Sequence, residues 1–266
     1  MQLSRFVSFL VLASLSPLAQ AGVEMDLVTR NAAGEETDRA KIYAQSKMIR
    51  MDQGGGNSDA SMIFLGDRFI YVDHREKSYI VMDEAMLNEV SAKISDAMTE
   101  MEAQLANMPP EQRAMVEQMM KGRMKGMMGE QGAASPKPRV EAVGSSKWRS
   151  YSCERYAVFT GSQKNQEVCA AKLDDVAGSD EVIEAFIGMA AYIKKMTDSM
   201  PMMPKDGLNP GELMEQFDGF PVHTIDYVGA KVLRETSLDS VSEKALDKDM
   251  FSAPPGYRRE DPLGQR

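Results

Sequence analysis

The chain has 266 residues and a net charge of −9, with 40 acidic against 31 basic side chains. This acidic balance argues against a nucleic-acid-binding protein, which needs a basic surface. Two histidines and two cysteines without zinc-ligand spacing argue against a zinc centre, and 23 methionines are the unusual feature of the composition.

Residues 1–21 have the layout of a secretory signal peptide. Arg5 supplies the positive charge, the apolar run 6–15 is too short to span a bilayer, and Ala19 and Ala21 form a small-x-small cleavage site. We therefore expect cleavage after Ala21 and a mature periplasmic protein without a transmembrane segment.

From residue 23 to 82 the apolar alternation predicts an antiparallel meander. The strands are expected at 23–30, 38–45, 47–52, 60–65, 68–73 and 77–82. In the last two strands both faces are apolar, and we assign Phe69, Tyr71 and Tyr79 to one face. A sheet that is apolar on both faces must be covered on both or must line a cavity on one. These three aromatic residues are therefore the predicted wall of a binding cavity.

Methionine concentrates on three predicted amphipathic helices. The first begins after Asp83 and carries one apolar stripe at spacings of three and four residues, formed by Met86, Val90, Ile94, Met98, Met101, Leu105 and Met108. A second helix is expected over 110–128, and a third over 182–200. Further strands are expected at 139–143, 147–150, 167–173, 221–228 and 231–238.

The two cysteines flank a predicted hairpin, strand–turn–strand, at residues 156–168. This arrangement brings Cys153 and Cys169 to the same end of the hairpin, and exported chains oxidise such pairs. We predict a structural disulfide.

The sequence contains no nucleophile elbow, phosphate-binding loop, zinc-protease motif or dinucleotide fingerprint. His74 and His223 have no nucleophile placed in sequence to partner them, so we interpret both as ordinary surface or strand histidines. We predict that the protein is not an enzyme and needs no cofactor.

Three interpretations of the methionines remain open: core packing, an adaptable lid over an apolar ligand, and soft-metal binding. Thioether sulfur prefers Cu(I), and the alternative Cu(I) or Ag(I) site would use Met98, Met101, Met124 and Met127. Residues 110–139 hold six basic against three acidic side chains, so this segment could also contact an anionic membrane surface.

Four segments together resemble an uncharacterised family of exported bacterial proteins. They are residues 62–73, 77–83 with the pattern Lys-x-Tyr-x-x-Met, 153–158 and 251–257. More distantly, the layout of 23–257 is similar to that of the periplasmic lipoprotein carriers. That resemblance implies an open, curved antiparallel half-barrel whose concave apolar face is covered by helices. The carriers' acyl-binding residues have no matching motif here, so the resemblance assigns no site residue.

We therefore predict an α+β protein in which a curved antiparallel sheet is covered by Met-rich amphipathic helices. Its parts are a signal peptide at 1–21, one domain at 22–257 with a helical insertion at about 84–138, and a disordered tail at 258–266. We predict non-catalytic periplasmic binding of a lipid or acyl chain or of an apolar polypeptide segment, the alternatives being the Cu(I) site and a structural envelope role. The predicted contacts are a lid of Met98, Met101, Leu105, Met119 and Met120, facing the wall of Phe69, Tyr71 and Tyr79.

Overall fold

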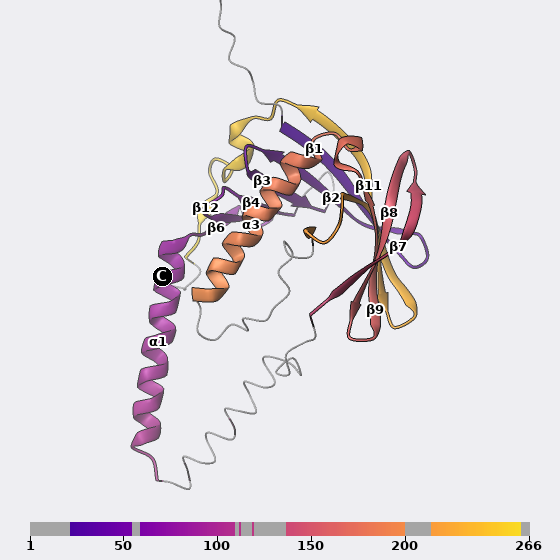
Figure 1. The fold of residues 1–266 in the computed structure, drawn as a ribbon. Coiled ribbons are helices and arrows are strands. Elements are labelled where there is room, and N and C mark those ends of the chain that lie inside the picture. Colours follow the sequence, from indigo (N-terminus) through magenta and orange to yellow (C-terminus); the bar gives the residue numbers. More distant parts are fainter. Residues whose placement is uncertain are drawn as a thin grey trace, which may run out of the picture.

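The computed structural model describes residues 22–54, 59–109, 112, 119, 137–199 and 214–261. Twelve strands form one sheet in the order β12-β6-β5-β4-β3-β2-β1-β11-β10-β9-β8-β7 (Figure 1). The strands are β1 (Gly22–Asn31), β2 (Glu36–Gln45), β3 (Met48–Gln53), β4 (Ala60–Phe64), β5 (Phe69–Asp73), β6 (Ser78–Met82), β7 (Arg139–Trp148), β8 (Tyr151–Thr160), β9 (Gln163–Ala171), β10 (Phe220–Val228), β11 (Lys231–Lys244) and β12 (Arg258–Arg259). The sheet is curved and open, because β12 and β7 form its two edges.

All neighbouring strands are antiparallel except β12 and β6, which are parallel. Two meanders, β1–β6 and β7–β11, are joined where β1 pairs with β11, so the first and one of the last strands lie side by side. The predicted α+β class and curved antiparallel sheet are confirmed. The predicted strands at 139–143 and 147–150 are one strand, β7, which bends at a bulge between Ala142 and Gly144.

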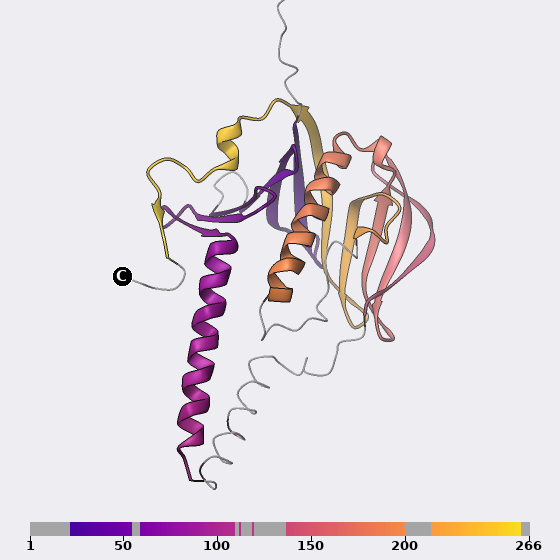
Figure 2. The same cartoon turned by 60° about the vertical axis from the view of Figure 1, so that its left-hand side comes forward.

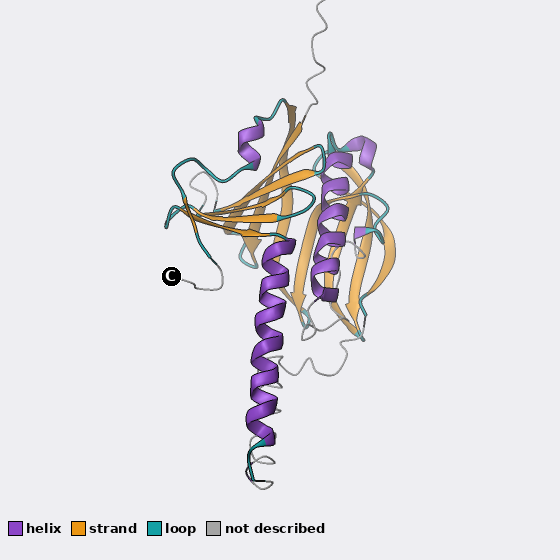
Figure 3. Cartoon of the chain, turned by 90° about the vertical axis from the view of Figure 1, so that its left-hand side faces the viewer, coloured by secondary structure: helices purple, strands orange, loops and turns teal. Residues whose placement is uncertain are grey.

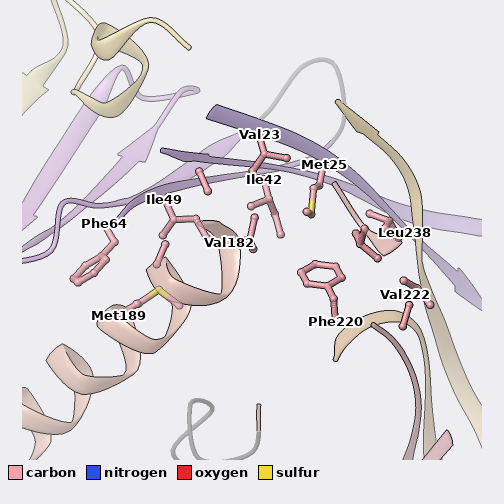
Figure 4. Packing of buried hydrophobic residues seen from close by; sticks show 14 of the residues in the cluster. Val23, Met25, Ile42, Ile49, Phe64, Val182, Met189, Phe220, Val222 and Leu238 are labelled. Carbon is pink, nitrogen blue, oxygen red and sulfur yellow. The ribbon is translucent and has the colours of Figure 1, made fainter. Parts of the chain in front are cut away.

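The helix α3 (Ser179–Ser199) packs inside the curve of the sheet and forms the main core with it (Figure 2). Its buried face includes Val182, Ala185, Met189 and Ala190. The core side chains that surround this face include Val23, Met25, Ile42, Ile49, Phe64, Phe220, Val222 and Leu238 (Figure 4). This helix therefore has the role that its apolar periodicity predicts.

The helix α1 (Glu84–Ala106) begins where predicted, because the Asp83 carboxylate accepts a hydrogen bond from the backbone N–H of Met86 at 2.9 Å. It extends away from the sheet (Figure 3), and Leu87 in its first turn is its one buried residue. The expectation that this helix covers the concave side is wrong. An apolar stripe fixes which face of a helix avoids water but does not fix the surface that it packs against.

The β2–β6 part of the sheet is covered on its second face as well. The short helix η4 (Lys248–Phe251) and the segment after it pack Phe251 against a second core formed by Tyr43, Ile63, Ile70, Val72 and Leu246. Both apolar faces are thus filled by this chain's own residues, which is one of the two solutions that the sequence pattern allowed.

The prediction of a disordered tail from residue 258 is wrong for its first residues. Arg258 and Glu260 donate backbone hydrogen bonds to the carbonyl oxygens of Lys77 and Tyr79, at 2.9 and 2.8 Å, which adds β12 to the edge strand β6. An edge strand has free backbone groups that a passing segment can pair with. The predicted signal peptide, most of the second helix and residues 262–266 lie outside the described residues.

Within the described part of the chain, neither helix combines the length and apolarity that crossing a membrane would require. The predicted disulfide is confirmed: Cys153 on β8 is bonded to Cys169 on β9, with the two Cα atoms 5.4 Å apart.

Candidate functional site

Three of the predicted lid residues, Met98, Met101 and Leu105, belong to the second half of α1, a helix that extends away from the sheet (Figure 3). Met98 is 37% exposed, and Met101 and Leu105 are half-buried. Met119 is 58% exposed, and Met120 lies outside the described residues.

The predicted wall does not exist as one surface. In the pairing of β5 with β6, Phe69 lies opposite Met82 and Tyr71 opposite Ile80, whereas Tyr79 lies opposite Val72. Directly paired residues share a face, so Tyr79 points to the side opposite Phe69 and Tyr71. Tyr79 packs against the second core with η4, and Phe69 is buried in the main core. The assignment of these three residues to one face is wrong.

A cavity of about 360 Å³ lies between α3 and the segment 214–219, which leads into β10. Its apolar lining consists of Leu173, Ile183, Ile187, Met214 and Phe217. The polar residues Lys172, Glu215 and Asp218 and the backbone of Gly219 complete the lining. We call this space the α3 cavity.

The wall of the α3 cavity opposite α3 is fixed by two contacts with Tyr156 and one with Ala171. The ring of Phe217 lies 5.4 Å from that of Tyr156, and the backbone N–H of Asp218 donates to the Tyr156 hydroxyl at 3.2 Å. Gly219 then packs against the backbone of Ala171, in a conformation with φ of +145° that favours glycine. The cavity is therefore bounded by a helix of the main core and by an anchored turn.

Large aliphatic side chains of the α3 cavity remain in contact with water. Leu173 is 39% exposed and Ile187 is 40% exposed, although both line a concave site. The α3 cavity therefore combines large exposed aliphatic side chains with a concave site. Sequence reasoning missed the site because Leu173 precedes α3, whereas Phe217 is brought in from a later segment.

A buried polar network lies on the other face of the sheet. Ser61, which is 1% exposed, donates its hydroxyl proton to Asp52 at 2.6 Å and accepts from Arg50 at 3.1 Å. His74 Nε2 lies 2.7 Å from the same hydroxyl, and His74 Nδ1 lies 3.0 Å from the Tyr257 hydroxyl.

This network joins β3, β4 and the turn after β5 to the C-terminal segment. Because the Ser61 hydroxyl donates to Asp52, His74 Nε2 is the donor to the Ser61 oxygen. The Tyr257 hydroxyl donates to His74 Nδ1, so every group has a partner. A buried serine whose hydroxyl donates a hydrogen bond to a carboxylate is not placed to attack a substrate. The sequence interpretation of His74 as an ordinary histidine missed this partner, because Ser61 lies on another strand.

His223 is likewise more than an ordinary strand histidine. Its ring is stacked on that of Trp148, with centroids 3.7 Å apart and planes 1° from parallel. Burial lowers the pKa of His223 below its usual value, so the ring is neutral at neutral pH.

The alternative Cu(I) site has two of its four proposed ligands, Met98 and Met101, within the described residues. Met124 and Met127 lie outside them. Across the described part of the chain, no three His, Cys, Asp or Glu side chains are grouped so that they could hold a metal ion.

The sequence profile of DUF4412, a domain of unknown function, matches residues 99–257, and the chain belongs to this family. The expectation of an uncharacterised family is thereby confirmed. No curated protein matches the chain in sequence.

The chain is similar to several solved structures at low scores. An uncharacterised conserved protein from Thermus thermophilus is 9% identical with a TM-score of 0.44, over 91% of each chain. PNGF-II is 9% identical with a TM-score of 0.40, over 91% of this chain and 31% of that one. A chain of the MucA/MucB complex of Pseudomonas aeruginosa is 11% identical with a TM-score of 0.37, over 89% of this chain and 56% of that one. At these values none of the three indicates a shared function.

Proposed function

We propose that this protein is a non-catalytic periplasmic binding protein and that its α3 cavity takes the aliphatic chain of a lipid or fatty acid. The observation that carries the proposal is the α3 cavity itself, in which Leu173 and Ile187 expose aliphatic surface inside a concave site. A volume of about 360 Å³ falls in the lower part of the range of small-molecule sites.

The lining favours an apolar ligand with a polar end. Each methylene group that moves from water into such a site contributes about 0.8 kcal/mol. Lys172, Glu215 and Asp218 are available for a polar headgroup, while the aliphatic side chains surround the chain.

Two further features support the periplasmic location and the non-catalytic role. The Cys153–Cys169 disulfide is typical of exported proteins and agrees with the predicted signal peptide. The hydrogen-bond network of Ser61 and His74 supports a non-catalytic role, because the Ser61 hydroxyl is buried and donates its proton to Asp52.

The test is a fluorescence titration of the mature protein with dansyl-undecanoic acid, followed by competition with unlabelled palmitate. We expect saturable binding that palmitate reverses. The variant Ile187→Glu places a carboxylate in the cavity lining and should weaken binding by about tenfold or more, because burying a charge against an aliphatic chain is costly.

The matched control is Leu233→Glu, which introduces the same charge at another exposed aliphatic residue, 52% exposed, on β11. This variant should bind like the wild type. An absence of saturable binding to the wild-type protein, or equal binding by Ile187→Glu and the wild type, would refute the proposal. Displacement of the probe by an apolar peptide but not by palmitate would reassign the cavity to a polypeptide segment.

A further inference from the structure

A second cavity, of about 220 Å³, lies among β7, β8, β9 and β10. It is lined by Ser146, Lys147, Trp148, Arg155, Glu167, Cys169, His223 and Ile225. We call it the Trp148 cavity.

The Trp148 cavity is separate from the α3 cavity. Arg155 lies opposite Cys169 in the β8–β9 pairing, and both line the Trp148 cavity. The neighbouring pair, Tyr156 and Val168, points to the other face, where it packs against Phe217 of the α3 cavity. The two cavities share no lining residue, and Phe217 of the α3 cavity packs on the face of these strands opposite to Arg155, so the two sites can be tested independently.

Three nitrogen atoms of this cavity are buried without a hydrogen-bond acceptor among the described residues: Trp148 Nε1, Arg155 Nε and His223 Nε2. The Trp148 indole can only donate. Arg155 Nε lies 3.2 Å from Glu167 Oε1, and His223 Nε2 lies 3.5 Å from Glu235 Oε2, but neither contact has the alignment of a hydrogen bond.

Buried donors of this kind are rare in folded proteins and indicate a ligand or ordered solvent. Stacking holds the Trp148 and His223 rings parallel, so the directions of their nitrogens are fixed. The cavity is thus a preformed set of donors rather than a gap in the packing.

One carboxylate of the lining is shared by two cations. Arg155 faces the cavity with Glu167, whose Oε1 lies 3.2 Å from Arg155 Nε, and Lys164 donates to the other oxygen of Glu167 at 3.2 Å. Lys147 brings no charge to the cavity, because it pairs with Ser152 and so lies on the face opposite to Trp148 and Arg155. The Arg155 guanidinium has five N–H groups, so Glu167 leaves donors on it for a further acceptor.

We propose that the Trp148 cavity binds a carboxylate group, held by the indole N–H of Trp148 and the guanidinium of Arg155, with His223 as the third donor. A carboxylate offers two oxygens that accept several hydrogen bonds, and its charge is complementary to the arginine. The volume is below that of most drug-sized sites, so the ligand is a small organic acid or the carboxylate of a polypeptide.

Trp148 is the one tryptophan of the chain, so intrinsic fluorescence reports on this cavity alone. The full mature protein is titrated with sodium acetate, sodium succinate and N-acetylated dialanine, each against sodium chloride at equal ionic strength. We expect a saturable change in Trp148 emission with the carboxylates and none with chloride. The C-terminal amide of the dipeptide should leave the emission unchanged.

Two variants test the assigned donors. His223→Phe keeps an aromatic ring on Trp148 but removes the nitrogens, and Arg155→Gln removes the positive charge. Each should weaken carboxylate binding by about tenfold, the loss expected for a hydrogen bond to a charged group. Arg234→Gln, which removes an arginine paired with Asp226 outside the cavity, is the matched control and should bind like the wild type.

Tighter binding of the dipeptide than of acetate or succinate would identify a polypeptide carboxylate as the ligand, and the reverse order would identify a free acid. The proposal is overturned if no carboxylate gives a saturable change, if the dipeptide amide binds as well as the acid, or if folded Arg155→Gln retains wild-type affinity. The variant Ile187→Glu should leave the carboxylate titration unchanged, so the proposal for the Trp148 cavity and the proposal for the α3 cavity can fail independently.

Discussion

Gly219 connects the anchored turn of the α3 cavity to β10, and its replacement by alanine should be strongly destabilising. The residue has a φ of +145°, in a region that is essentially restricted to glycine. A Cβ atom there would also lie 2.9 Å from the carbonyl carbon of Ala171 and closer still to its oxygen. Both obstacles come from the backbone, so a side-chain rotation cannot relieve them.

The magnitude follows from these two contributions. Holding a residue with a side chain in this region costs about 1–3 kcal/mol. Forcing an additional methyl group into a packed site costs about 1–3 kcal/mol more. We therefore expect Gly219→Ala to lower the free energy of unfolding by about 2–6 kcal/mol, a large part of the stability of a typical domain.

Gly229→Ala provides the matched control. Gly229 also has a positive φ, +62°, but no atom lies within 4 Å of the position that its Cβ would take, so only the backbone cost of about 1–2 kcal/mol applies. Urea unfolding followed by far-ultraviolet circular dichroism measures both values. Equal losses in the two variants would show that the close approach to Ala171 is not the cause, and our reasoning about this turn would be refuted.

Three further predictions concern other parts of the fold. Ser61→Ala should lower the free energy of unfolding, measured in urea, by about 1–3 kcal/mol because Asp52 and His74 lose a buried partner. The control Ser145→Ala, at an exposed serine, should change it by less than about 0.5 kcal/mol. Equal effects of the two variants would contradict the stabilising role of the network. Replacing both disulfide cysteines by alanine should cost about 3 kcal/mol, since the bond closes a loop with a sequence separation of 16, and reduction of the wild type should give a similar loss of urea resistance. Because burial lowers the pKa of His223, the unfolded chain binds a proton near pH 6.5 that the folded chain does not, so this residue's contribution to stability is present above about pH 6.5 and is lost as the pH falls. The melting temperature of His223→Phe should therefore fall less between about pH 7 and 5 than that of the wild type, and parallel profiles would contradict the assignment.

The sequence predicts those parts of the fold that depend on neighbouring residues. The alternation in residues 23–82 places six strands to within two residues of their observed bounds, and Asp83 is the observed N-cap of α1. The Cys153–Cys169 bond follows from a hairpin in which both partners are close in sequence. Periodicity and capping act over a few residues, so one sequence is enough to detect them.

To predict which residues of a hairpin share a face, the pairing register of its two strands must also be known. Asp73 pairs with Ser78 across a four-residue connection, so an odd-numbered residue of β5 shares its face with an even-numbered residue of β6. Alternation within each strand is correct in the prediction, but the phase between the strands is not. A shift of one residue moves every side chain to the other face, and this is why Tyr79 was assigned to the wrong side.

The sites themselves depend on contacts between distant segments. Trp148 ends β7 and His223 lies on β10, two strands that are separated in the sheet by β8 and β9. Ser61 and Tyr257 meet the two nitrogens of one histidine ring from opposite ends of the chain. No pattern in the neighbouring sequence distinguishes these residues from ordinary strand and loop residues.

The described methionines also change where an adaptable surface should be sought. Met25 has no exposed surface and Met189 is 8% exposed, so in these positions methionine fills the core between α3 and the sheet. Met98 on α1 is 37% exposed and lies outside that core. Methionine content alone therefore does not locate a binding site, since the same side chain serves close packing in one place and remains exposed in another. The α3 cavity is a stronger candidate for a binding site. It combines exposed aliphatic side chains and a defined volume with a wall that Phe217 and Asp218 fix through their contacts with Tyr156. A ligand can bind to such a preformed site without the free-energy cost of ordering the side chains that line it.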